Sequence, residues 1–251
     1  MSFTPIIHAL GLPPETRVEQ RVPKKLLVEN GAPTAADKRQ INEGIEEILW
    51  QAVLKPANLG VPAFRDVVRE YLEIAVLTVS FRPSSKPARL IELIHRAIPY
   101  PVLLVSNNGL TASVSVAHKR WSQGEAGKVV IEELRATAPF NPQTPSKEES
   151  EFLARLSVIG LPQGSLFALY QSWLDSILAL EAAQITGAFR QPTTENSAAL
   201  RENLDARAQA LRDLALLRAQ AENETQINRR VELNLAIKKL ENHLGELAAR
   251  L

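Results

Sequence analysis

The sequence predicts a mixed α/β fold, in which a small sheet with flanking helices is followed by an all-helical C-terminal region with a long coiled-coil-like tail. Two observations predict this class. Between residues 71 and 136, short runs rich in β-branched side chains are separated by turn residues, as strands are. Residues 196–251 contain no proline and repeat leucine at spacings of three and four, as packed helices do.

Composition limits the class of protein. The chain has 251 residues, of which 45% are hydrophobic, and a formal net charge of +1, which argues against a strongly basic nucleic-acid-binding chain. The absence of cysteine excludes disulfides, thiolate metal sites and cysteine nucleophiles. The first residues lack the pattern of a secretory signal, and no stretch approaches the roughly 18 apolar residues of a membrane span. We expect a cytoplasmic protein without membrane contacts.

Residues 1–34 predict an irregular basic arm. The segment is rich in proline and shows little periodicity, and only the string RVPKKLL indicates a short turn or strand. Its cations Arg21, Lys24 and Lys25 are candidates for contacts with nucleic-acid phosphate or with the acidic side chains of a partner. The alternative is that they are ordinary solvated surface charges.

Residues 35–138 predict the mixed α/β domain, which begins with a helix over residues 35–54. Thr34 is placed to cap this helix, and Pro56 ends it. Its apolar residues fall at helical spacing on one face, namely Ile41, Ile45, Ile48, Leu49, Ala52 and Val53.

The rest of this domain predicts four strands and one helix. A strand over 71–81 is followed by a helix that begins at Pro87 and ends before Pro99. Strands are then expected over 99–106, 110–119 and 128–136, and the sequence Asn-Asn-Gly at 107–109 predicts a tight hairpin turn between the first two of these. No glycine-rich phosphate-binding loop follows any of these strands.

Residues 139–192 predict a linker and a pair of helices. Ser146 and Glu149 have the spacing of a capping box, which starts a helix that ends before Pro162. A longer helix is expected over 165–185, and Gly187 and Pro192 separate it from the tail.

Residues 193–251 predict either one long helix with a polar interruption near 222–230 or an antiparallel hairpin of two helices. The apolar repeat needs burial, since a long helix with a leucine-lined face is stable only beside a partner. That partner is either the chain's own helices between Phe152 and Ile185, or another protein or a second copy. The candidate partner-binding residues are Leu233, Ile237, Leu240, Leu244 and Leu247.

Sequence motifs for catalysis are sparse. The four histidines lie in different segments without metal-ligand spacing, so neither a metal nor a cofactor is expected. A metal-dependent nuclease could use Asp66 with Glu73, because nucleases of the restriction type place two carboxylates and a lysine on adjacent strands around magnesium. Ala75 stands where that lysine would be required, so no catalytic residue is assigned.

Three strings carry a family resemblance: RVPKKLLVENG at 21–31, IPYPVLLVS at 98–106 and NRRVELNLAIKKLENHL at 228–244. Their order and spacing resemble the bacterial domain-of-unknown-function family 4391 over nearly the whole chain. The resemblance implies genes beside helicases and DNA methyltransferases in restriction-modification-like and phage-defence loci, and it implies no catalytic residues.

These observations lead us to expect a non-enzymatic accessory subunit of a bacterial DNA-modification or antiphage defence complex. Its helical tail would join it to a helicase, to a methyltransferase or to a second copy. The alternatives are the metal-dependent nuclease and a DNA-binding specificity module that uses the cations of the N-terminal arm.

Overall fold

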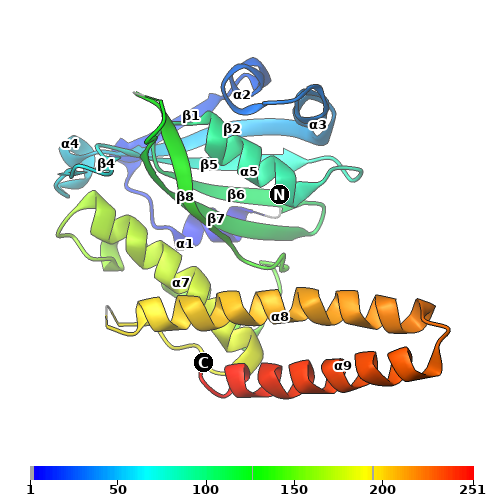
Figure 1. Ribbon diagram of the computed structural model, residues 1–251. Coiled ribbons are helices and arrows are strands. Elements are labelled where there is room, and N and C mark those ends of the chain that lie inside the picture. The colour runs from blue at the N-terminus through cyan, green and yellow to red at the C-terminus, as the bar shows by residue number, and fades with distance from the viewer. Residues whose placement is uncertain (1–2, 126, 194) are drawn as a thin grey trace. The chain divides into compact units, whose positions relative to one another are not determined.

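The computed structural model describes residues 3–125, 127–193 and 195–251, and it divides into two compact units, Met1–Leu180 and Glu181–Leu251 (Figure 1). The first unit contains the sheets, and the second contains the long C-terminal helices. Mixed α/β is therefore the correct class. No helix in the described part of the chain is long and apolar enough to cross a membrane.

The main sheet has six strands in the order β1-β2-β5-β6-β7-β8. All neighbours are antiparallel except β5 and β6, which are parallel and are connected by helix α5. Two further short strands pair with each other as a hairpin. The strands are β1 (Arg17–Arg21), β2 (Ile45–Leu54), β3 (Phe64–Arg65), β4 (Glu70–Tyr71), β5 (Ile74–Phe81), β6 (Val102–Asn108), β7 (Thr111–Trp121) and β8 (Val129–Ala136).

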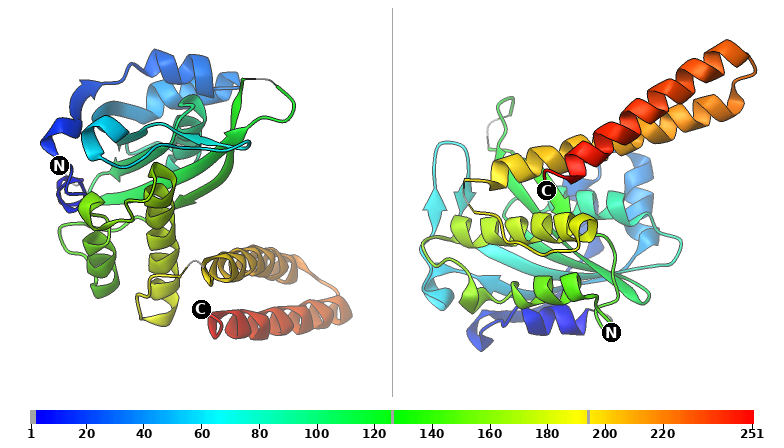
Figure 2. Two further views of the ribbon diagram at one scale, coloured as in Figure 1. Left: turned by 90° about the vertical axis from the view of Figure 1, so that its left-hand side faces the viewer. Right: turned by 90° about the horizontal axis from the view of Figure 1, so that it is seen from below.

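Helices cover both faces of this sheet, as the two views of Figure 2 show. One face packs on α2 (Lys24–Gly31), α3 (Ala35–Gly44) and α5 (Pro87–Ala97), and the other carries α1 (Thr4–Ala9), α6 (Lys147–Ala154) and the first part of α7 (Leu166–Thr186). A short helix, α4 (Pro56–Leu59), follows β2. Because both faces are covered, the central strands are buried almost throughout.

Several sequence predictions of the first unit are confirmed. The strand expected over 71–81 is β5, and the helix between Pro87 and Pro99 is α5. Gly109 adopts a positive φ of 71° in the turn between β6 and β7. Ser146 and Glu149 form the reciprocal hydrogen bonds of a capping box at the start of α6.

The helix expected over 35–54 is wrong in its second half, because the chain leaves α3 after Gly44 and continues as β2. A Cβ atom on Gly44 would lie 2.8 Å from Leu90 Cδ1 and 3.2 Å from Ser85 Cβ, so a larger residue would require these side chains to shift. The pairing of β2 with β5 shifts register twice, and each shift turns the following residues to the other face. Buried residues therefore recur at 45, 48, 52 and 54, a spacing that imitates a helix.

The irregular arm expected over residues 1–34 is also a misreading. The segment forms α1, the edge strand β1 and helix α2, and Leu27 of α2 is buried in the core beneath the sheet. A two-turn helix and a five-residue edge strand carry too little periodicity to be recognised, and both gain their stability from the sheet on which they pack.

The sequence left two alternatives open for the tail, one long helix or an antiparallel hairpin, and the structure shows the hairpin. Helices α8 (Ser197–Asn223) and α9 (Ile227–Ala248) pack against each other and run in opposite directions, with residues 224–226 between them (Figure 1). The polar stretch near 222–230 therefore contains the turn. An ion pair of 2.7 Å between Arg218 and Glu241 also links the two helices. The C-terminal region is thus helical, and its described residues 195–251 form a hairpin rather than an extended coiled-coil rod.

Candidate functional site

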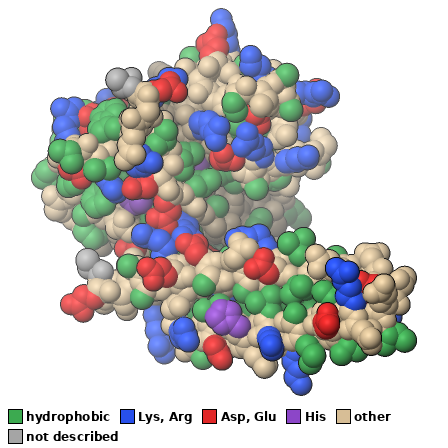
Figure 3. All heavy atoms as spheres, viewed as in Figure 1, with side chains coloured by type: hydrophobic (Ala, Val, Ile, Leu, Met, Phe, Trp, Pro, Cys, Tyr) green, Lys and Arg blue, Asp and Glu red, His purple; other side chains and the backbone are tan. Residues whose placement is uncertain are grey.

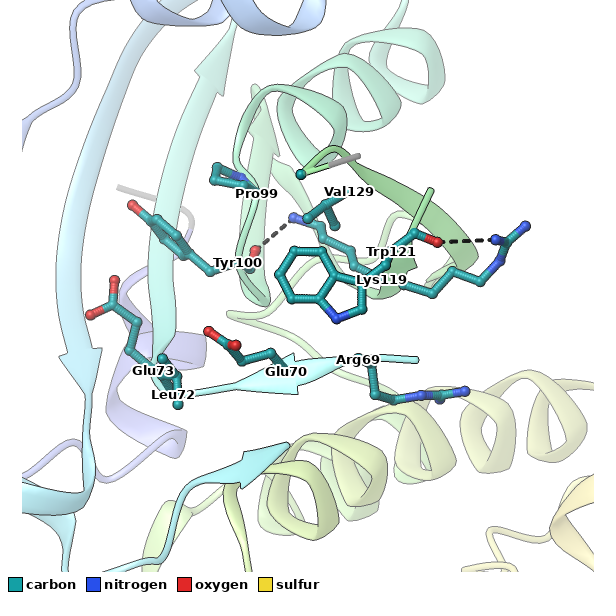
Figure 4. Close-up of a pocket in the computed structure, with 11 residues that line it drawn as sticks. Arg69, Glu70, Leu72, Glu73, Pro99, Tyr100, Lys119, Trp121 and Val129 are labelled. Atoms are coloured by element: carbon teal, nitrogen blue, oxygen red, sulfur yellow. Dashed lines mark hydrogen bonds between the residues drawn. The ribbon is translucent and has the colours of Figure 1, made fainter. Parts of the chain in front are cut away.

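A pocket of about 320 Å³ opens beside the end of β7 in the first unit. Four segments form its wall (Figure 4). They are β4 with the loop before β5, the loop before β6, the end of β7 and the facing end of β8. The lining residues are Arg69, Glu70, Leu72, Glu73, Pro99, Tyr100, Lys119, Arg120, Trp121, Gly127 and Val129.

Lys119 is the most unusual residue of this pocket. Its side chain is only 5% exposed, and its Nζ donates hydrogen bonds to the carbonyl oxygens of Ile98 and Tyr100, the latter at 2.6 Å (Figure 4). Burial lowers the pKa of Lys119 to about 7, because an ammonium group loses its hydration there. This amine is therefore divided between its charged and neutral forms near neutral pH.

The fold explains why a lysine occupies this position. Alternate residues of β7 face α5, as the 3.0 Å contact between Ser115 Oγ and His95 Nε2 shows, and Lys119 lies four residues after Ser115 on the same face. Ile98 caps the C-terminal end of α5, where carbonyl groups lack partners within the helix. Lys119 supplies hydrogen-bond donors to this turn.

Aromatic rings form much of the remaining wall. The side chain of Trp121 is 38% exposed, and its backbone N–H donates to the carbonyl of Val68 at 2.8 Å, which joins the tip of the β3–β4 hairpin to the end of β7. Tyr100 stacks on Trp50 at 6.2 Å between ring centroids. Beyond Tyr100 lies a second pocket of about 370 Å³, lined by Trp50 and by residues of β1 and α2.

Three of the charged residues at the pocket, Arg69, Glu70 and Glu73, form ion pairs with neighbours. Arg69 binds Glu132 at 3.2 Å and lies over the ring of Phe167. Glu70 pairs with Arg65 on the facing strand. These pairs fix the positions of the rim and leave its net charge close to neutral.

On the opposite face of β7, a buried polar chain joins the sheet to α7. The Tyr71 hydroxyl contacts Nδ1 of His118, His118 Nε2 lies 2.9 Å from Gln171 Oε1, and Gln171 Nε2 donates to Asp175 at 2.9 Å. Tyr170 accepts a hydrogen bond from the backbone N–H of Ala117 at 2.7 Å. Desolvation raises the pKa of both tyrosines, so both hydroxyls stay protonated and act as structural donors.

The structure does not place the nuclease candidates Asp66 and Glu73 in a metal site. Asp66 lies in the β3–β4 turn, where its Oδ1 accepts the backbone N–H groups of Val68 and Arg69 at 2.7 Å. Glu73 borders the pocket and forms an ion pair of 2.9 Å with Lys55. No group of three or more histidine, aspartate or glutamate side chains suited to a metal occurs among residues 3–125, 127–193 and 195–251.

The three predicted phosphate contacts lie near one another in sequence but serve different local roles. Lys24 donates to the carbonyls of Asn42 and Ile45, where α3 changes into β2, and burial lowers its pKa. Arg21 pairs with Glu47 at 3.2 Å and Lys25 with Glu29 at 3.6 Å, in both cases on the surface. Lys24 is thus held by backbone groups, whereas Arg21 and Lys25 stay accessible.

The five residues of the predicted apolar seam face the interior of the hairpin to differing degrees. Leu247 is buried, whereas the other four, Leu233, Ile237, Leu240 and Leu244, are half-buried. A groove of about 550 Å³ near the turn between the helices leaves Leu233 reachable beside Leu216. The seam is therefore largely used within the hairpin, between α8 and α9.

Sequence reasoning missed Lys119 and its pocket. One signal was present: Ser113, Ser115, Ala117 and Lys119 alternate along a strand whose other residues are buried. A lysine that continues such a row in a central strand must be buried and must find partners. The row was not recognised because the strand over 110–119 was predicted without deciding which of its two faces would be buried.

Comparison with known proteins agrees with the resemblance seen in the sequence. Residues 10–244 match the family described as Domain of unknown function (DUF4391). No curated protein and no solved structure matches the chain. Because the match covers nearly the whole chain, including the sheet, the pocket and most of the hairpin, this protein belongs to the DUF4391 family.

Proposed function

We propose that this protein is a non-enzymatic accessory subunit of a cytoplasmic bacterial DNA-modification or antiphage defence complex, and that its helical hairpin binds a helicase or DNA methyltransferase. The observation that carries the proposal is a set of large apolar side chains on the outside of α8 and α9. These exposed residues are Leu211, Leu216, Ile227, Val231 and Leu235. They are 42–75% exposed, although the hairpin also has an apolar interior of its own.

The arrangement of these residues favours a protein partner. Ile227, Val231 and Leu235 recur every four residues, so they form one stripe along α9. Apolar side chains also gather along the face of the hairpin that Figure 3 presents. A contiguous exposed apolar patch is costly in water and is typical of surfaces that bind another protein.

Local structure favours an accessory role over the nuclease alternative. The carboxylate of Asp66 already accepts two backbone N–H groups, and that of Glu73 is paired with Lys55. Recruiting both to a metal would require breaking a turn and an ion pair. The hairpin surface, in contrast, is free to bind without rearrangement of the residues described.

A capture experiment tests the proposal. The tagged full-length protein is recovered from its native host and its partners are identified by mass spectrometry, in parallel with the double variant Val231→Asp/Leu235→Asp. A helicase or methyltransferase should accompany the native chain and be lost at least tenfold in the variant, because two charges would be desolvated in the interface.

The matched control is Asn234→Asp/Asn242→Asp, which adds the same charge at exposed polar positions of α9. It should retain the partner. Recovery of no helicase or methyltransferase, or equal recovery with all three chains, contradicts the proposal. Circular dichroism of both variants checks that the helices still form.

A further inference from the structure

The Lys119 pocket has a chemistry that the proposed subunit role does not use. Lys119 is the one lining residue whose charged group is both buried and held by backbone carbonyls, among the described residues of the pocket. A structural donor to the α5 turn could equally be a neutral side chain. What distinguishes a lysine here is the geometry of its amine.

A neutral amine satisfies this site completely. Its nitrogen has four tetrahedral directions, of which one is the bond to Cε and two are N–H bonds directed at the carbonyls of Ile98 and Tyr100. The fourth direction holds the lone pair. The two acceptors flank Pro99, which lines the pocket together with Tyr100 and Lys119, so the nitrogen lies at this wall with its lone pair unused by either carbonyl.

The surroundings favour the neutral form of this amine and admit a small molecule. Lining residues Pro99, Val129 and Trp121 place apolar groups around it, and no acidic side chain is hydrogen-bonded to Nζ in the described structure (Figure 4). The volume of about 320 Å³ suits a compound of roughly one aromatic ring with substituents. Tyr100 and Trp121 offer ring surfaces for stacking.

We propose that the pocket binds small, preferably aromatic, aldehydes and that Lys119 attacks their carbonyl carbon to form an imine. The nitrogen lone pair forms the new N–C bond while the C=O π electrons move to oxygen. Transfer of a proton from nitrogen to that oxygen gives a carbinolamine. Loss of one water molecule, with a second proton from nitrogen, gives the C=N bond. No oxidant or reductant is consumed, and desolvated lysines are the usual amines for this chemistry.

Charged groups around the pocket bear on the pH dependence of the reaction. His95 on α5 interacts electrostatically with Lys119. Arg69, Glu70 and Glu73, which lie in or beside β4, line the same pocket. Arg120, the next residue on β7, also lines it. On β8, Ile131 pairs with Lys119 and Val129 lines the pocket, and neither is charged. Since burial lowers the pKa of Lys119 to about 7, adduct formation should rise between pH 6 and 8 and then level off.

Reductive trapping tests the proposal on the full-length chain. The protein is treated with benzaldehyde and sodium cyanoborohydride at pH 7 to a low overall extent, and benzylation of each lysine is quantified by peptide mass spectrometry. Lys119 should be labelled at least about tenfold more than Lys25, because Lys25 lies on the surface in an ion pair with Glu29 and has no pocket that holds the aldehyde beside it. Labelling of Lys25 without labelling of Lys119 would overturn the proposal.

A pair of variants on β8 separates the pocket from simple amine reactivity. Val129→Trp fills the pocket and should reduce labelling of Lys119 at least fivefold without changing that of Lys25. Val130→Trp, at the next residue outside the lining set, is the matched control and should leave Lys119 labelled. Equal labelling of Lys119 in both folded variants would show that the aldehyde reaches the amine by local unfolding and would refute the pocket.

Discussion

The first unit, which contains the sheets and is called the sheet unit below, and the helical hairpin obtain their stability in opposite ways. Strands β5, β6 and β7 are covered on both faces, so nearly all of their residues are buried, including polar ones such as Ser115 and Thr78. The two long helices bury few residues: Ser197, Leu204, Ala210 and Leu214 on α8, and Leu247 on α9. A similar apolar content therefore produces a dense core in one region and a partly exposed surface in the other.

This difference shows that the spacing of apolar residues in the sequence does not by itself predict how much of each apolar side chain is buried. In the sheet unit, a central strand contacts two strands and two helical layers, and almost every side chain has a neighbour. In a hairpin of two helices, each helix has one neighbour within the hairpin. Apolar residues outside that seam, such as Leu216 and Leu235, are more than half exposed.

The largest effect is expected from truncating one leucine in each region. Leu104→Ala on β6 removes a fully buried side chain and should lower the free energy of unfolding by about 2–5 kcal/mol. Leu240→Ala on α9 removes a half-buried one and should cost about 1 kcal/mol. All three tryptophans, Trp50, Trp121 and Trp173, lie in the first unit, so fluorescence reports its unfolding separately.

Urea titrations followed by tryptophan fluorescence and by far-ultraviolet circular dichroism make this measurement. Leu104→Ala should shift the fluorescence midpoint, whereas Leu240→Ala should change only the dichroism transition. If Leu240→Ala shifts the fluorescence midpoint as much as Leu104→Ala does, the two regions are not independent in stability and the comparison fails.

A second effect concerns the buried amine of the sheet unit. The pKa of Lys119 is about 7 in the folded chain and about 10.4 in the unfolded chain, so between these values the unfolded state binds more protons. The free energy of unfolding should therefore rise with pH across this window, by about 5 kcal/mol from this residue. Lys119→Met should lack that rise.

Fluorescence-monitored urea titrations at pH 7 and pH 10 provide the test. The difference in stability between the native chain and Lys119→Met should grow in favour of the native chain as pH increases. Lys239→Met, at an exposed position of α9, is the control and should follow the native chain. A parallel pH dependence of the native chain and Lys119→Met would contradict the assigned burial.

The smallest effect is expected from removing one ion pair in each region. The Asp37 carboxylate on α3 accepts hydrogen bonds from Arg89 and Thr34, which lower its pKa to about 2. Its stabilising contribution is thus present above the unfolded value near 4 and is lost as pH falls through 2. Arg89→Met should lower the melting temperature at pH 6, and this difference should shrink toward pH 2.

Arg218→Met on the hairpin is the counterpart. Its pair with Glu241 is exposed at both ends, so solvent screens it and the substitution should change the dichroism transition little at any pH. Thermal melting at pH 6 and pH 2.5 checks both variants. An Arg89→Met effect that does not depend on pH would mean that lost packing, rather than the carboxylate, explains it.

Much of the fold could be predicted where the signal is local. The turn at 107–109, the capping box at Ser146 and Glu149, and the helix between Pro87 and Pro99 depend on residues close in sequence, and the structure contains all three. Strand β2 was missed because its bulges, which arise from pairing with β5, give its buried residues a helical spacing. The pocket was missed because its lining comes from four separated segments.

The sequence by itself determined the class of the fold, the turns and caps, and the position of the break in the tail, because each follows from the conformational preferences of a few neighbouring residues. Only the tertiary structure decided which apolar residues are covered, where Lys119 finds its two carbonyl partners, and which side chains of α8 and α9 stay exposed. Burial and pKa depend on what packs from distant segments, and no local pattern of residues specifies that packing.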